Sequence, residues 1–519
     1  MAIGSVLFGL APPAVAAAST HTVFVAPDGR EGASGTHQQP LASINEAVGL
    51  LARAGGPGVV EVLAGTYAER VVLRNRHDVV IRSYKGEHVI LDGGSLRAPA
   101  GRSAMVTILD SSGVTIDGLD IRGYDTTSLT AMPIGIYVHG ASSRISLRNN
   151  HVHSMGNYNG TLGSFELNAH GIAAYGDVAE HPIFDLQITH NEVDHLALGA
   201  SESVVVNGNV DGWSITGNYI HDNNNIGIDA IGFEPTLTGP ARYSRANRAR
   251  NGEIADNVVE NIISRGNPSY YEDGSWCNCA DGIYVDGGTA IRIERNTLRN
   301  NDIGIEIAAE NPRGSADHVV VADNFVTRSG YVGITTGGYC NGDEACGGVR
   351  TGRAFDNTFV NNTLYANNQL ADGSPEFLVQ YYTSRTTIEN NIFYATGRAP
   401  ALLGTVPGAQ HDGTSTPPRT DGNLYYATGG RPAVATFGIL GHTYTGWAAY
   451  RRATGLDQKS RFTNPRLQNP AHGDLHLRSD SPAVNAGLAL PLRIVGFFDI
   501  DREVRVQGGR IDIGADEWR

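Results

Sequence analysis

A short phrase that recurs along the chain restricts the fold more than any other feature. It consists of Asn, any residue, and then an aliphatic or aromatic residue, and it occurs eight times at intervals between 27 and 41 residues. Self-similarity at such a period is typical of a solenoid. The short intervals suit one coil of a parallel β-helix, and the long ones suit a coil plus an insertion. The phrases begin at Asn150, Asn191, Asn218, Asn257, Asn296, Asn324, Asn362 and Asn391.

A second phrase predicts the strands. It is Gly-Ile followed by alternating residues, and alternation with a period of two marks a strand with one buried face. The Ile and the residue two places later are therefore expected to point inward. Asn at a fixed turn position can bond to the same amide one coil above. The Gly-Ile phrases start at Gly135, Gly171, Gly227, Gly282, Gly304 and Gly333.

The length of 519 residues is accordingly interpreted as one stacked domain with capped ends. Apolar residues at helical spacing between Leu41 and Leu51, with Ser43 as N-cap, predict a helix over the first coil. The segments 481–487 and 511–518 are expected to close the far end. We expect the cap and first coils over 19–100 and the main coils over 101–400, with insertions at 151–170, 233–281 and 339–353. A coil and cap segment follows over 401–519.

Composition narrows the cellular context and the partners. Residues 1–18 are apolar and end in small residues, which predicts a secretion signal and a compartment that permits disulfides. The net charge of −14 argues against a nucleic-acid partner, and no apolar run is long enough for insertion into a membrane. Cys277 and Cys279 are expected to cross-link with Cys340 and Cys346, with a zinc site as the alternative.

The two ends of the chain carry a family resemblance. The opening FVAPDGREGASGTHQQPLASINEAV and the ending SPAVNAG…DIDREVRVQGGRIDIGADEW resemble those of secreted bacterial right-handed parallel β-helix proteins, the pectate-lyase-like superfamily. The resemblance implies an all-β, right-handed parallel β-helix with an N-terminal cap helix and a C-terminal cap segment. It also implies a glycan partner. The superfamily includes glycoside hydrolases, polysaccharide lyases, uronan epimerases and non-enzymatic adhesins, so the reaction has to be argued from the site.

Aligning the Gly-Ile phrases places three carboxylates, Asp229, Asp286 and Glu306, on neighbouring coils of one sheet face. Hydrolysis of a glycosidic bond needs two carboxylates, one as proton donor and one as nucleophile or base. We predict Asp286 and Glu306 as this pair and Asp229 as a third catalytic group. The arrangement is similar to that of β-helical glycoside hydrolases such as β-xylosidases, which carry an Asp and a Glu on successive coils.

Further residues are predicted to bind substrate because they flank the same strands or lie in the aromatic-rich insertion. Aromatic rings can stack on the apolar faces of sugars, although they can equally pack the loop on the coil. His153, Glu166 and His170 of the earlier insertion could also line the groove. The predicted substrate-binding set is Glu310, Tyr284, Asp281, His139, Tyr270, Tyr271, Trp276, Arg265 and Gln380.

Two other functions stay open from the sequence. A polysaccharide lyase would need a base other than Lys, because Lys occurs only at Lys85 and Lys459. Its base would come from Arg, Tyr or His residues near the insertions. A non-catalytic glycan-binding surface protein is the other alternative. No cofactor is required by the sequence, and calcium is an option at Asp343 and Glu344. The candidate bases are Arg242, Arg245, Arg265, Tyr270, Tyr271 and His221.

Overall fold

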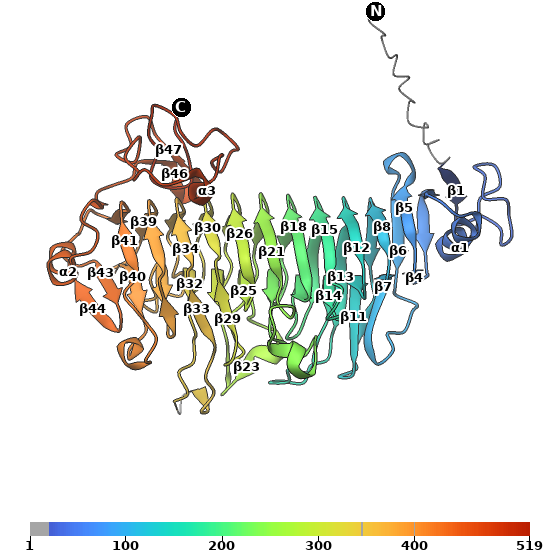
Figure 1. Cartoon of the computed structure of the whole chain (residues 1–519), viewed down its shortest axis with the longest axis horizontal. Coiled ribbons are helices and arrows are strands. Elements are labelled where there is room, and N and C mark those ends of the chain that lie inside the picture. The colour runs from blue at the N-terminus through green and yellow to red at the C-terminus, as the bar shows by residue number, and fades with distance from the viewer. Residues whose placement is uncertain (1–19, 344–345, 399) are drawn as a thin grey trace, which may run out of the picture.

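The chain forms a right-handed parallel β-helix, as predicted (Figure 1). The structure is a computed structural model that describes residues 20–343, 346–398 and 400–519. The predicted signal, residues 1–18, lies outside the described residues. Each coil gives one strand to each of three long sheets, so strands that pair are separated in sequence by one turn of the solenoid.

Three sheets, here called I, II and III, run the length of the stack. Sheet I contains β1 (His21–Val25), β2 (Gly58–Val62), β5 (His77–Ser83), β8 (Ser112–Asp117), β12 (Ser143–Arg148), β15 (Ile183–Thr189), β18 (Val210–Thr216), β21 (Arg250–Ala255), β26 (Thr289–Glu294), β30 (Val320–Ala322), β34 (Thr358–Val360), β38 (Thr387–Glu389) and β41 (Arg419–Asp421), with β29 (Ser315–Asp317), β33 (Arg353–Phe355) and β37 (Thr383–Ser384) at its side. Sheet II contains β3 (Gly65–Tyr67), β6 (Val89–Asp92), β9 (Leu119–Arg122), β13 (His151–Asn157), β16 (Glu192–Ala197), β19 (Tyr219–His221), β22 (Val258–Glu260), β27 (Thr297–Arg299), β31 (Phe325–Thr327), β35 (Thr363–Tyr365), β39 (Ile392–Ala395), β42 (Leu424–Ala427) and β45 (Arg461–Phe462), with β10 (Asp125–Thr126) beside β13. Sheet III contains β4 (Val71–Arg74), β7 (Gly101–Leu109), β11 (Ala131–His139), β14 (His170–Gly176), β17 (Val204–Gly208), β20 (Ile228–Ile231), β25 (Asp281–Asp286), β28 (Ile303–Ala308), β32 (Val332–Thr336), β36 (Phe377–Val379), β40 (Ala401–Thr405), β43 (Thr436–Ile439) and β44 (His442–Thr445).

Helices close both ends of the stack (Figure 1). The predicted cap helix is confirmed as α1 (Ile44–Ala54), whose N-cap Ser43 accepts a hydrogen bond from the Glu46 N–H and whose buried face covers the first strands. At the far end, α2 (Trp447–Thr454) packs Tyr450 on Phe437, with ring centroids 4.6 Å apart. Outside the three sheets lie α3 (Leu492–Val495), several short 3-10 helices, and two hairpins, β23 (Tyr271–Glu272) with β24 (Ser275–Trp276) and β46 (Leu467–Asn469) with β47 (Asp474–Leu477).

A row of stacked Asn side chains holds the coils together at the corner between sheets I and II. Each Asn donates its backbone N–H and its side-chain amide to the Oδ1 atom of the Asn one coil later, over about 3 Å. For Asn257 the donor is Asn218 and the next acceptor is Asn296. The eight predicted positions all take part, and Asn423 extends the row by one more coil.

The turn that carries this row is short in every coil from β8 to β42. The residue before the ladder position adopts a left-handed backbone, with φ of 55° at Asn149, 59° at Asp256 and 67° at Gly217. Such a residue reverses the chain direction within one or two positions. The loops at the two ends of sheet III, in contrast, vary from a few residues to about twenty. The insertions therefore all border sheet III.

Replacing Asn257 by Ala should destabilise the stack strongly. The change leaves the N–H and the side-chain amide of Asn218 without their acceptor, and a buried unpaired polar group costs about 1–3 kcal/mol. We expect the free energy of unfolding to fall by about 2–5 kcal/mol in urea titrations. The exposed Asn464→Ala serves as control and should change it by less than about 1 kcal/mol. Equal free energies of unfolding for the two variants would show that the Asn row does not stabilise the stack.

Three predicted boundaries are wrong. The range 233–281 is not one insertion, because strands β21 and β22 lie inside it and divide it into the loops 232–249 and 261–280. Residues 151–157 are not insertion but strand β13, which pairs with β9 and β16 and buries Val152 and Met155 in the core; the inserted loop is 158–169. The segments 481–487 and 511–518 do not close the end of the stack. They dock over the turns between sheets I and II (Figure 1), where Asn361 donates to the Asp512 carbonyl over 2.8 Å and Asn390 to the Leu488 carbonyl over 3.0 Å. The donors are turn residues that directly precede two positions of the Asn row. Ala483 packs there in one cluster with Ile392 of sheet II.

Candidate active site

The three predicted catalytic carboxylates lie on three consecutive strands of sheet III. In the strand register, Asp229 of β20 is opposite Tyr284 of β25, and Tyr284 is opposite Glu306 of β28. Asp286 is two residues further along β25, opposite Ala308. The predicted placement of Asp286 and Glu306 on neighbouring coils therefore agrees with the register. Upstream, the alignment omitted one coil, because β17 begins after Ser203 rather than with Gly-Ile.

These carboxylates are buried, whereas the sequence predicted an open solvent face. Asp229, Asp286 and Glu306 are 2%, 4% and 6% exposed. The loops that leave the strands account for this difference. The backbone N–H of Glu310, in the loop after β28, donates to Asp286 Oδ1 over 2.6 Å. The loops thus cover this part of the sheet face.

The carboxyl groups of Asp281 and Glu306 are buried neighbours, close enough for the charge of Glu306 to raise the pKa of Asp281. Two carboxylates can bond to each other only if one of them holds a proton. Burial, and then the charge of Glu310, raises the pKa of Glu306 to about 8. Burial, and then the charge of Glu306, raises the pKa of Asp281 well above its usual range. The pair therefore retains a proton at neutral pH.

Asp229 and Asp286 belong to the same electrostatic cluster. Burial raises both pKa values well above the usual range, and neighbouring carboxylates add to the effect: Glu202 on Asp229, and Glu310 on Asp286. Hydrogen bonds from the backbone oppose the shift at Asp286, which accepts the Glu310 N–H. Asp286 thus combines a raised pKa with one contact that favours its charged form.

Glu310 marks the solvent side of the cluster. The residue as a whole is exposed to solvent, but many protein atoms surround its carboxyl group. This burial, and then the charge of Glu234, raises the pKa of Glu310. The hydroxyl of Tyr339 bonds to the same carboxyl and opposes the shift. Tyr339 is itself 44% exposed. A substrate would meet these two side chains before it reached Glu306.

The sequence did not single out Glu202, Glu234 or Tyr339. Glu234 follows the phrase from Gly227, and Tyr339 follows the phrase from Gly333 at almost the same distance as Glu310 follows its own. An alignment that continued past the strand ends would have found Glu234 and Tyr339. Glu202 precedes the omitted coil. Its pKa is raised to about 8 by burial and next by the charge of Glu310.

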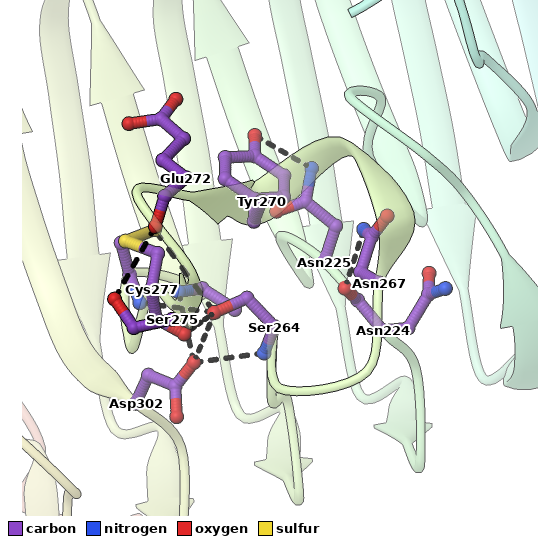
Figure 2. Close-up of a disulfide and its surroundings, with 11 residues drawn as sticks. Asn224, Asn225, Ser264, Asn267, Tyr270, Glu272, Ser275, Cys277 and Asp302 are labelled. Atoms are coloured by element: carbon purple, nitrogen blue, oxygen red, sulfur yellow. Dashed lines mark hydrogen bonds between the residues drawn. A yellow bond between two sulfur atoms is a disulfide. The ribbon is translucent and has the colours of Figure 1, made fainter. Parts of the chain in front are cut away.

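The insertion after β22 approaches the cluster through Tyr270. Its hydroxyl accepts a hydrogen bond from Asn225 over 3.2 Å, and burial raises its pKa (Figure 2). Asn267 anchors the same loop by donating to the Asn224 carbonyl over 2.8 Å. Ser264 donates to Asp302, a carboxylate whose charge acts on Asp281. The loop is therefore tied to the strands beside the carboxyl pair.

Other predicted substrate-binding residues lie further away. Tyr271 and Trp276 pack on each other across the hairpin, with centroids 4.7 Å apart, and Arg265 is exposed. His139 lies four strands before Asp286 on the same sheet, about 19 Å away by strand spacing. Gln380 is buried two strands after β28, and its Oε1 has no hydrogen-bond partner. A long glycan could span these positions, whereas a single sugar could not.

Two histidines proposed from the sequence are not near the cluster. His153, expected to line the groove, and His221, a candidate base, both lie on sheet II. Glu166 is an exposed loop residue. His170 is buried on β14 and bonds to the Tyr175 hydroxyl, and burial lowers its pKa to about 3. It is therefore neutral at physiological pH.

The expected disulfide pairing is wrong. Cys277 bonds to Cys279 and Cys340 to Cys346, so each bridge closes its own loop. The Cα atoms are 5.5 and 5.7 Å apart, which is ordinary disulfide spacing, and the zinc alternative is excluded for these sulfurs. The first bridge lies beside Ser264 (Figure 2). Asp343, the calcium option, accepts the Cys346 N–H, and Glu344 lies outside the described residues.

Reduction of both disulfides should loosen two loops and leave the main unfolding transition in place. Bridges across 2 and 6 positions restrict the unfolded chain little, by about 2 kcal/mol each in the chain-entropy model. We expect faster amide exchange in 261–280 and a small change in Tm. Peptide mapping without reductant checks the pairing directly. A peptide linking the two insertions would contradict the local bridges.

The chain is similar to two curated proteins, and no family model matches it. It is 33% identical to the "Uncharacterized protein YwoF" of Bacillus subtilis over 468 residues, which cover 89% of this chain and 92% of that protein. It is 32% identical to "Pectate lyase PEL9" of Emericella nidulans over 150 residues, about a third of that protein. Among solved structures, XylC in complex with xylose has the same fold, with a TM-score of 0.51 at 10% identity over 95% of this chain and 98% of XylC.

Proposed function

The chain belongs to the same family as YwoF of Bacillus subtilis, and we propose that it is a carbohydrate-active enzyme, a glycoside hydrolase that uses Glu306 and Asp286. The observation that supports this most is the buried carboxyl pair of Asp281 and Glu306. A general acid must be protonated at working pH. The pKa of Glu306, raised by burial to about 8, meets this requirement.

In this mechanism Glu306 donates its proton to the glycosidic oxygen, and the Glu306 carboxylate left behind accepts a hydrogen bond from the protonated Asp281, whose pKa is raised well above its usual range. Asp286, one strand away, attacks the anomeric carbon or activates a water for that attack. The Glu310 N–H holds the Asp286 carboxylate in place over 2.6 Å. The two-residue offset between the strands is compatible with retention and with inversion. Entry of substrate past Glu310 and Tyr339 requires their side chains to move.

A polysaccharide lyase is the second candidate, and it has support of its own. The chain is similar over 150 residues to a pectate lyase, and a carboxylate cluster of this density would attract a divalent cation. A calcium ion there would neutralise an acidic glycan and lower the pKa values of the cluster. The base would be an Arg, Tyr or His, since Lys85 and Lys459 are the only lysines.

One digest of a glycan panel separates the candidates. A hydrolase releases new reducing ends without ultraviolet absorption, and EDTA leaves the rate unchanged. A lyase releases unsaturated uronates that absorb in the ultraviolet, and calcium dependence would show as loss of activity in EDTA. Binding without products in any glycan would support the non-catalytic alternative and contradict both mechanisms.

The proposed site of action is outside the cell. The two disulfides support this location, because thiols stay reduced in most cytosols. In the described part of the chain, no helix is long and apolar enough to cross a membrane. Fractionation of the native host, with detection of the chain in the medium, tests the proposal.

A further inference from the structure

A second cluster of chemically active side chains lies on the outer face of sheet II. Strand β13 carries the sequence His151-Val152-His153, and alternation places both imidazoles on the outer face while Val152 is buried in the core. Asp120 of β9 is opposite His151 in the strand register. Strands β9 and β13 thus bring together two imidazole nitrogens and one carboxylate oxygen.

The donors lie at contact distance. His153 Nε2 is 3.0 Å from Asp120 Oδ1, and the two imidazole rings stack with centroids 4.0 Å apart. One donor atom each from Asp120, His151 and His153 falls within 4.8 Å of the others. This spacing allows one ion to contact all three.

Neighbouring groups hold these donors in place. His88 Nε2 lies 2.9 Å from the second oxygen of Asp120, and His151 Nε2 lies 2.6 Å from Asp194 Oδ2 on β16. Hydrogen-bonded partners of this kind orient ligands in metal sites. The side chains of Asp120 and His153 are 12% and 15% exposed and that of His151 is 37% exposed, so an ion could reach the donors from solvent.

A surface pocket of about 530 Å³ adjoins the cluster. Its lining includes His88, Asp120 and His151 together with turn residues of the corner between sheets I and II. An ion held by three protein donors at this place would keep a coordination position open toward the pocket.

We propose that Asp120, His151 and His153 bind one divalent transition-metal ion of the zinc type. Two imidazoles with one carboxylate favour zinc, copper or nickel over magnesium and calcium, which prefer oxygen. A second donor set, His151 with Glu192 and Asp194, shares His151 and competes for the ion. The first set is preferred because it contains two nitrogens. The site faces away from sheet III and is independent of the proposed glycan chemistry.

The test uses the full chain, stripped with a chelator and titrated calorimetrically with zinc chloride. We expect saturable binding of one ion per chain, with a dissociation constant in the micromolar range or below. We expect His153→Asn to raise the dissociation constant for zinc by about tenfold to a hundredfold. The matched control is His318→Asn, which alters an exposed His that contacts Asp317 over 2.8 Å on sheet I, and it should bind as the native chain does.

Three outcomes would overturn the proposal. They are no saturable binding by the native chain, unchanged affinity in a folded His153→Asn variant, and loss of binding in Glu192→Gln but not in His153→Asn. If His153→Asn fails to fold, the visible absorption spectrum of the native chain titrated with cobalt chloride tests the proposal instead. Intense visible bands of a four- or five-coordinate nitrogen site support the assignment, and a spectrum of free cobalt contradicts it.

Discussion

Replacing Glu306 by Gln is expected to lower the rate of glycan cleavage at pH 7 by about a hundredfold to ten-thousandfold, the contribution of a general acid. The amide keeps the volume of the side chain but cannot give up a proton to the leaving oxygen. Asp286→Asn should lower the rate at least as much, because it removes the nucleophile or base. Initial rates of reducing-end release measure both effects.

The two variants should differ on an aryl glycoside with an acidic leaving group. Such a substrate needs little proton donation, so Glu306→Gln should recover much of its activity, whereas Asp286→Asn should not. Glu180→Gln, at an exposed position, is the matched control and should behave as the native chain does. Native rates in both folded variants would refute the assigned pair. An unchanged ratio between the two substrates would refute only the assigned roles.

The stability of the chain is expected to fall as pH rises from 5 to 8. The pKa values of Glu202, Glu306 and Glu376 are raised to about 8 in the folded chain, in each case first by burial. The unfolded chain releases these protons near pH 4. Between the two values the folded chain holds more protons than the unfolded one, so the free energy of unfolding decreases with pH. Each retained proton contributes a slope of about 1.4 kcal/mol per pH unit.

Glu202→Gln isolates one of these protons. The variant should be more stable than the native chain at pH 8 and should show a shallower decline in its urea midpoint between pH 5 and 8, because the amide carries no charge to bury. Glu180→Gln should leave the slope unchanged. The titrations are made in EDTA, since a bound cation would favour the charged carboxylates. A native midpoint that rises with pH would contradict the raised pKa values.

Periodic features of the chain were predictable, and features set by single loops were not. The Asn phrase gave the ladder because one hydrogen-bond geometry repeats in each coil, and the Gly-Ile phrase placed Asp229 and Glu306 on one face. The coil of β17 was missed because Ser203 occupies the glycine position. The burial of Asp286 depends on the loop that carries Glu310, and no period specifies how a loop folds back. The local bridge at Cys277 depends on loop geometry in the same way.

The short turns between sheets I and II have a consequence for how such a chain can change. Each coil makes the same Asn contact whatever the length of the loops since the previous coil. A longer loop beside sheet III therefore costs only its closure entropy, which grows slowly with length. The register of later strands is reset at every turn. Stability is thus concentrated on one edge of the solenoid, and variation is confined to the two edges around the carboxylates. Loops there can therefore be lengthened without refolding the stack.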